Sequence, residues 1–208
     1  WFTNKRVLLL TMDSPFLDNS LVFPYLGILY LIAVAKKAGF KIHYINKSDK
    51  TITKEKFGHP ALFYTDEFDM GHIDRYKGFD LICISCLTAQ AHQAYSVKAK
   101  LRERYPHIKI MIGGSHTRGY LEDCIKEGFD IVCVGDGERI FENILTGNTK
   151  GLEKLLHPLS NKSTLVFQDK LNESEMNSFP IPLRQQEYIG RYKYLLENRP
   201  ATTLVNSR

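Results

Sequence analysis

The sequence predicts an α/β fold: a flavodoxin-like (Rossmann-like) doubly wound sheet of five parallel strands in the order 2-1-3-4-5, followed by a C-terminal linker. Five short apolar runs continue without alternating with polar residues, which is typical of parallel strands covered on both faces. Helical patterns separate most of these runs and indicate right-handed crossovers. The 208 residues suffice for one such domain with an extension.

The predicted strands are residues 7–10, 42–45, 81–84, 108–112 and 131–134. A first helix with Gly39 as its stop is predicted from positions at helical spacing, which are Leu26, Leu29, Tyr30, Ala33, Val34 and Lys37. A second helical stripe ends at Pro106 and consists of Ala94, Val97, Leu101 and Tyr105. Shorter helices are expected at 121–126 and 138–145, and the irregular residues 47–78 predict one helix plus a loop.

The composition changes after Gly147. Residues 149–208 contain a weak helical pattern at 152–156, a strand-like run at 164–168 and a polar stretch, "DKLNESEMNS". These patterns provide too few apolar positions for a separate core. We therefore expect the α/β domain to end at residue 148 and the remainder to be a linker.

Charge and hydropathy exclude several classes of protein. The net charge of +5 is scattered along the chain, which argues against a nucleic-acid partner. The sequence has neither an apolar run long enough to span a membrane nor a signal peptide at its start, so a cytoplasmic location without a membrane partner is expected. Four cysteines, at positions 83, 86, 124 and 133, lie mostly in apolar runs and are expected to be buried thiols, since Cys83 lies too deep in its strand for a redox pair with Cys86.

The candidate site lies where the predicted strands end, because open parallel sheets bind ligands beyond their carboxyl ends. These ends read "TMDSPF" (11–16), "SCLTAQ" (85–90), "GGSHTRG" (113–119) and "GDGER" (135–139). Gly113 and Gly114 permit close approach of a ligand or of neighbouring backbone, although one such pair alone is explained by a tight turn. Four ends rich in small and hydroxyl residues together favour a broad, flat ligand.

Other interpretations of these strand ends are less favoured. "GDGERI" has Ile140 where a dinucleotide-binding motif needs its third glycine, and the sequence has no P-loop. Asp136 and Glu138 begin a predicted helix, so helix capping is the simplest explanation of their charge. His116 is the one histidine expected at the ligand-binding edge, where the alternative is a turn residue bonded to its own backbone.

Three segments of the chain can be compared with a known family, and they read "FPYLGILYLIAVAKKAGFKIHYIN", "FDLICISCLTAQAHQAYSVKAKLR" and "IKIMIGGSHTRGYLEDCIKEGFDIVCVGDGERIFENIL". Taken together, they resemble the N-terminal cobalamin (B12)-binding domain of B12-dependent radical S-adenosylmethionine (radical SAM) enzymes. The resemblance covers about the first 150 residues. It implies that the chain is the cofactor-holding, non-catalytic part of such an enzyme, most often a methyltransferase. No catalytic residue and no protein ligand to a metal is assigned.

The resemblance also implies which residues contact cobalamin. Gly113 and Gly114 would leave room for the nucleotide tail, Ser85 and Leu87 would line its path, and the loop from Met12 to Phe16 would face the corrin. That loop lacks the histidine of a second B12 class, so base-off binding without a histidine ligand from the loop is expected. The full set of expected contacts is Met12, Asp13, Ser14, Pro15, Phe16, Ser85, Leu87, Thr88, Gly113, Gly114, His116, Gly135, Asp136, Gly137 and Glu138.

The C-terminal segment "FPIPLRQQEYIGRYKYLLENRPATTLVNSR" resembles the connector that leads into a radical SAM barrel. No Cys-x-x-x-Cys-x-x-Cys motif occurs among the four cysteines, so the [4Fe-4S] cluster and SAM are expected in a further domain of the parent protein. A regulatory or interaction module without B12 is the alternative from another class. An enzyme that uses FMN or a nucleotide sugar is a third possibility, for which the sequence offers no phosphate loop.

Overall fold

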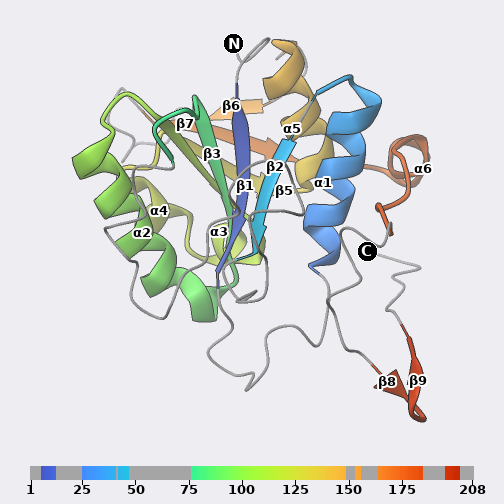
Figure 1. Cartoon of the computed structure of the whole chain (residues 1–208). Coiled ribbons are helices and arrows are strands. Elements are labelled where there is room, and N and C mark those ends of the chain that lie inside the picture. Colours follow the sequence, from blue (N-terminus) through green and yellow to red (C-terminus); the bar gives the residue numbers. More distant parts are fainter. Residues whose placement is uncertain are drawn as a thin grey trace.

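The computed structural model describes residues 6–12, 25–40, 42–46, 76–148, 153–155, 164–184 and 195–201. A seven-stranded sheet in the order β2-β1-β3-β4-β5-β7-β6 forms its centre (Figure 1). Its strands are β1 (Val7–Thr11), β2 (Ile42–Asn46), β3 (Leu81–Ser85), β4 (Lys109–Gly113), β5 (Ile131–Gly135), β6 (Glu153–Leu155) and β7 (Leu165–Asp169). All neighbours pair in parallel except β6, which is antiparallel to β7. The α/β fold class and the predicted order 2-1-3-4-5 are confirmed, and two further strands extend the sheet beyond the five that were predicted.

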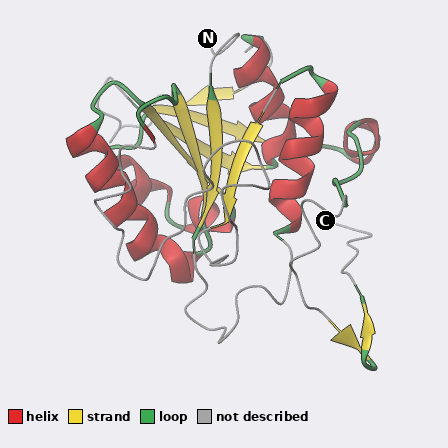
Figure 2. Ribbon diagram, viewed as in Figure 1, coloured by secondary structure: helices red, strands yellow, loops and turns green. Residues whose placement is uncertain are grey.

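Helices cover both faces of the sheet, with α1 and α5 on one side and α2 and α4 on the other (Figure 2). The helices are α1 (Leu26–Lys37), α2 (Ala91–Arg104), α3 (Ser115–Gly119), α4 (Leu121–Lys126), α5 (Gly137–Thr146) and α6 (Glu173–Ser178), with a short 3₁₀ turn η3 (Thr88–Gln90) before α2. A two-stranded hairpin of β8 (Leu195–Leu196) and β9 (Arg199–Pro200) is separate from this sheet. None of the described helices is both long and apolar enough to cross a membrane.

Successive side chains of each central strand enter two different cores. On β1, Leu8 and Leu10 pack towards α2 and α4, whereas Val7 and Leu9 pack towards α1 and α5. Because both faces of a strand are buried, nearly every position must be apolar. This confirms the explanation given for the continuous apolar runs in the sequence.

Helix α1 is buried over a wider surface than its sequence pattern predicts. Ile28, Ile32 and Ala35 are buried together with the predicted Leu29, Ala33 and Val34. Lys37, predicted on the apolar face, is exposed and its ammonium donates to the carbonyl of Ser178 at 3.1 Å. The reason is that α1 packs against both the sheet and the neighbouring α5, so more than one stripe of the helix is covered.

Residues 153–155 form a strand, β6, where the sequence pattern predicts a helix. The leucines around this segment have helical spacing, but the backbone of β6 pairs with β7, and this pairing overrides the local preference. The strand-like run at 164–168 is confirmed as β7, which pairs with β5 along its whole length. The polar stretch after β7 contains α6, whose Asn172 and Glu175 form a reciprocal capping box.

Arg139 ties this C-terminal segment to the turn between β5 and α5. Its guanidinium binds both carboxylate oxygens of Asp169 at the end of β7, one of them at 2.7 Å, and it also binds Glu175 in α6 at 2.5 Å. The hydrogen bonds to Asp169 and Glu175 raise the pKa of Arg139. The hydrogen bond from Asn172 N–H, and after it the one from Arg139, lower the pKa of Glu175, so both groups stay charged. The pairing positions α6 against the β5–α5 turn.

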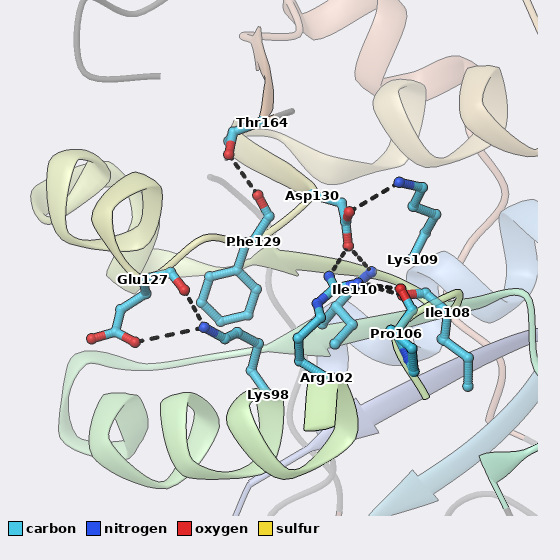
Figure 3. Close-up of polar contacts among 10 residues, drawn as sticks. All are labelled: Lys98, Arg102, Pro106, Ile108, Lys109, Ile110, Glu127, Phe129, Asp130 and Thr164. Carbon is cyan, nitrogen blue, oxygen red and sulfur yellow. Dashed lines mark hydrogen bonds and ion pairs between the residues drawn. The ribbon is translucent and has the colours of Figure 1, made fainter. Parts of the chain in front are cut away.

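Asp130 organises the opposite, amino-terminal end of the sheet (Figure 3). Its carboxylate accepts a hydrogen bond from the backbone N–H of Ile110 at 2.8 Å and forms ion pairs with Arg102 and, at 3.1 Å, Lys109. The hydroxyl of Thr164 donates to the carbonyl of Phe129 at 2.8 Å. These bonds fix the starts of β4 and β5 and the approach to β7 far from the strand ends at which a ligand is expected.

We predict that Asp130→Ala lowers the free energy of unfolding by about 2–3 kcal/mol, because it leaves the buried N–H of Ile110 without its acceptor. Lys109→Ala is the control. The Lys109 side chain is 53% exposed, so its loss should cost less than about 1 kcal/mol. Urea unfolding of both variants measures the difference, and equal losses would contradict the assigned role of Asp130.

Candidate functional site

A cavity of about 410 Å³ lies at the carboxyl ends of β3, β4 and β5, between the sheet and helices α1 and α5. Its volume falls within the range of about 300–1,000 Å³ typical of small-molecule sites. The strands contribute Leu9, Cys83, Ile84, Ser85, Met111, Gly113, Cys133 and Gly135 to its lining. The helices and turns contribute Leu26, Gly27, Ile28, Leu31, Gly114, Ser115, Arg118, Asp136, Gly137, Glu138 and Phe141.

Small residues at three neighbouring strand ends make room for this cavity. Ser85 ends β3, Gly113 ends β4 and Gly135 ends β5. Ser85 and Gly113 are register partners. A Cβ on Gly113 would meet only Cys133, at 3.5 Å, an ordinary contact distance. Neighbouring backbone therefore does not require a glycine at position 113. The glycine instead leaves room for the cavity between the sheet and helices α1 and α5.

Two residues deeper along the same strands, sulfur-bearing side chains form the next layer of the lining. Cys83 and Met111 are register partners, and the thiol of Cys133 donates to the sulfur of Met111 at 3.4 Å. Burial raises the pKa of Cys133 to about 12, and that of Cys83 well above its ordinary value, so both remain protonated thiols. Together with Leu9, these side chains form an apolar, polarisable floor.

Cys83 and Cys86 are not placed as a redox pair, in agreement with the prediction from the sequence. Cys83 packs in the core beneath α1 and α5, whereas Cys86 packs in the core beneath α2 and α4. Burial raises the pKa of Cys86 to about 12. Two thiols on opposite faces of a sheet, both protonated, do not form a reactive pair. Within the described ranges, no cluster of three or more His, Cys, Asp or Glu side chains could hold a metal ion.

Gly114 is required by neighbouring backbone. Its φ of +103° lies in a region that other residues rarely adopt, and an added Cβ would lie 2.6 Å from the carbonyl oxygen of Cys86. The two turns are joined by hydrogen bonds from Cys86 N–H to the Gly113 carbonyl, at 2.9 Å, and from His116 N–H to the Cys86 carbonyl, at 3.2 Å. Of the two glycines, Gly113 thus opens the cavity and Gly114 allows the ends of β3 and β4 to meet.

The "GDGER" turn has a structural role in addition to its place in the lining. Gly135, with φ of +100°, approaches the backbone of Asp169 so closely that a Cβ would overlap the carbonyl oxygen of that residue. Asp136 stands at the N-cap position of α5 but makes no side-chain capping bond. Its carboxylate instead accepts from the N–H of Leu171 at 3.0 Å and pairs with Arg118 at 3.2 Å. Asp136 therefore occupies the start of the helix, as predicted, but its side chain does not make a capping hydrogen bond.

Glu138 and Gly137 lie in the first turn of α5, where they line the cavity. The Glu138 residue is buried, although glutamate is seldom fully buried. A Cβ on Gly137 would meet the side chain of Leu31 at 3.7 Å, so this position is where α5 comes close to α1. The acidic first turn agrees with the helix-dipole argument made from the sequence for Glu138.

His116 lies on the other face of the sheet, outside the cavity lining. The buried imidazole of His116 contacts the Tyr95 hydroxyl at 2.7 Å and the Thr88 hydroxyl at 3.5 Å, and it stacks on Tyr120 with ring centroids 5.0 Å apart. Thr88 is exposed, as are Leu87 at 48% and Tyr120 at 47%. These residues form an amphipathic surface at the strand ends, next to the α2 side of the sheet.

Met12 is fully buried in the core beneath α2 and α4. Its carbonyl accepts hydrogen bonds from the Tyr25 hydroxyl at 2.8 Å and from the side-chain amide of Gln90 at 2.9 Å. The carbonyl oxygen of that amide in turn accepts from Leu87 N–H at 3.0 Å. The structure thus fixes the backbone at the end of β1, while Asp13, Ser14, Pro15 and Phe16, predicted to face the corrin, lie outside the described residues.

The structure places the described residues among the predicted contacts in three locations. Those that line the cavity are Ser85, Gly113, Gly114, Gly135, Asp136, Gly137 and Glu138. Leu87, Thr88 and His116 lie instead on the α2 side, and Met12 is in the core. The lining also contains Arg118 and the helix residues Leu31 and Phe141, which are not among the predicted contacts. The glycine pair could have drawn attention to the nearby Arg118, but no local pattern shows that Leu31 and Phe141 line the same cavity.

We predict that alanine destabilises the fold strongly at one of the two adjacent glycines and only slightly at the other. Gly114→Ala should lower the free energy of unfolding by about 3 kcal/mol or more, because it adds both φ strain and overlap with the Cys86 backbone. Gly113→Ala should change it by less than about 1 kcal/mol. Urea unfolding of the two variants tests this. A similar loss in both would show that Gly113 is also held by packing.

We also predict that His116 makes stability depend on pH. Burial lowers the pKa of its imidazole, with Asp123 partly opposing this. The unfolded chain, with a histidine pKa of about 6.5, then binds a proton more readily than the folded chain. The contribution of the neutral imidazole to the free energy of unfolding should therefore be fully present above about pH 6.5 and should decrease as the pH falls below that value. His116→Phe should show a shallower fall in urea unfolding across this range, and an unchanged slope would contradict the assignment.

Comparison with known sequences places this architecture in a family. Residues 20–145, more than half of the chain, match the family described as B12 binding domain. This segment includes the ends of β3, β4 and β5 and the two helices that enclose the cavity. No curated protein sequence matches the chain significantly. The chain belongs to the B12-binding domain family, whose ligand is cobalamin.

Proposed function

We propose that this chain is the cofactor-holding part of a B12-dependent radical SAM enzyme, most simply a methyltransferase, and that it binds cobalamin base-off. The observation that carries the cobalamin part of the proposal is the cavity at the ends of β3, β4 and β5. The radical SAM and methyl-transfer parts are supported by the sequence resemblance described above. In such an enzyme, bound cobalamin supplies a methyl group for transfer.

The residues present fit a detached nucleotide tail. Gly113 offers no side chain where a Cβ would occupy the cavity, and Ser85 offers a hydroxyl beside it. At about 410 Å³ the cavity suits one extended group and not a whole corrin. A separate site for the tail favours a base that is not bound to cobalt, which supports the base-off part of the proposal.

We propose that the corrin ring contacts the exposed strand-end surface formed by Leu87 and Thr88, together with the loop that follows Met12. Leu87 provides apolar area and Thr88 a hydroxyl. His116 is proposed to act through Thr88, because the hydroxyl of Thr88 lies 3.5 Å from the imidazole. The sequence at 11–16 has no histidine, which supports the absence of a histidine ligand from this loop.

The [4Fe-4S] cluster and SAM are proposed to belong to another domain of the parent protein. All four cysteines of the chain are buried, two beneath each pair of helices. Burial raises the pKa of each, whereas a cluster needs thiolate ligands on one accessible loop. The role left to this chain is to bind cobalamin and orient it towards that domain.

We predict that the full chain binds hydroxocobalamin, and that the cobalamin co-elutes with the protein on gel filtration and has a base-off absorbance spectrum. Gly113→Ala should weaken binding by about 10-fold, since an added methyl group occupies the cavity. Absorbance titration measures both affinities. The stability prediction above makes this variant suitable, because its fold should be intact.

Gly119→Ala is the matched control, since Gly119 lies in α3 outside the lining and an added Cβ would meet no atom within 4 Å. Its affinity for hydroxocobalamin should equal that of the unmodified chain. Equal weakening in both variants would show that the cavity is not the cobalamin site. A folded chain that binds no cobalamin would contradict the proposal and favour the alternative of a regulatory or interaction module.

A further inference from the structure

The cavity lining changes in character from its mouth to its floor. Every polar or charged side chain of the lining comes from a strand end, from α3 or from the start of α5, and these are Ser85, Ser115, Arg118, Asp136 and Glu138. The deeper side chains are apolar or contain sulfur. This order holds on the sheet and on α5, whereas α1 contributes only apolar residues and a glycine.

On the sheet, the change occurs over two residues. Ser85 and Gly113 form the outer layer, and Cys83 and Met111 form the layer beneath them. Because side chains on one face of a strand repeat every second residue, the two layers are about 7 Å apart. On α5, Phe141 lies one turn below Glu138, which is about 5 Å. The two elements therefore change from polar to apolar at a similar depth.

The floor has little hydrogen-bonding capacity to offer a ligand. The thiol proton of Cys133 is directed to the sulfur of Met111. Cys83 is a protonated thiol, which is only a weak donor and acceptor. Leu9, Leu31 and Phe141 have no polar side-chain atoms. A ligand group with several polar atoms would lose its bonds to water on entering and find no replacements.

We infer that the floor of the cavity selects the lower base of the cobamide and favours a planar, apolar aromatic base over a purine. This inference rests on the proposed function and specifies the ligand class of the same site. A benzimidazole or a phenol ring presents mainly carbon to Met111, Cys83 and Phe141, and sulfur makes favourable contacts with aromatic rings. Adenine places an exocyclic amine and further ring nitrogens in the same space. The polar mouth suits the ribose and phosphate that connect the base to the corrin.

Four cobamides test the inference by absorbance titration of the full chain: cobalamin, which carries dimethylbenzimidazole, p-cresolylcobamide, adenylcobamide, and cobinamide, which lacks the nucleotide. We expect similar dissociation constants for cobalamin and p-cresolylcobamide. Adenylcobamide should bind about 10-fold more weakly because its polar groups lose hydrogen bonds. Cobinamide should bind more weakly than cobalamin, since it leaves the cavity unfilled.

Met111→Gln provides the complementary test, since it places an amide of similar length in the floor. The ratio of the adenylcobamide to the cobalamin dissociation constant should fall by about threefold or more, because the amide can bond to the purine. This ratio is measured within one variant, so a loss of folded protein affects both values alike. Cys83→Ser is a second variant of the floor that should lower the ratio in the same direction.

Cys124→Ser is the matched control. It exchanges a buried thiol for a hydroxyl in the core on the other face of the sheet, outside the lining, and should leave the ratio unchanged.

Equal affinity for adenylcobamide and cobalamin would overturn the inference, as would equal affinity for all four compounds, while cobalamin binding itself would stand. If none of the four binds to the folded chain, the proposed function fails and the inference fails with it.

Discussion

The close approach of the β4 end to the β3 end, at Gly114 and Cys86, is the constraint on which the candidate site depends. The Cys86 backbone donates to Gly113 and accepts from His116, and Gly114 permits both bonds because it has no Cβ. Helix α3 begins directly after this contact, and its residues lie on both sides of the strand ends: Ser115 and Arg118 line the cavity, whereas His116 lies outside it. As a result, His116 and Thr88 lie on one side of the strand ends, while the cavity opens on the other.

A second close approach holds the C-terminal segment in place. Gly135 brings the end of β5 against Asp169, and Asp136 and Arg139 from the same turn then bind Leu171 and Glu175. A short stretch of five residues therefore forms part of the cavity and also attaches β7 and α6. The same turn can line the cavity and hold the C-terminal segment, because some of its atoms face the cavity and others contact Asp169, Leu171 and Glu175.

The sequence predicted the fold well because its signals are local. Continuous apolar runs mark β1 and β3 to β5, since both faces of these strands must be buried. The weak helical pattern at 152–156 predicted a helix, but residues 153–155 form a strand, because the pairing of β6 with β7 depends on residues more than ten positions away. The strand ends identified the edge of the sheet at which the cavity lies, but they could not assign Gly113 and Gly114 to different roles. The contact of Leu31 with α5 joins positions more than a hundred residues apart, which no local pattern encodes.

The two strands beyond β5 also have a consequence for self-association. Without β7, the backbone of β5 would present a row of unpaired N–H and C=O groups, and such an edge promotes intermolecular strand pairing and aggregation. With β7 in place, the outer position passes to β6, a strand of only three residues that runs antiparallel to its neighbour. A strand this short offers few groups for pairing with another chain. The extension thus protects the β5 side of the sheet from the addition of foreign strands.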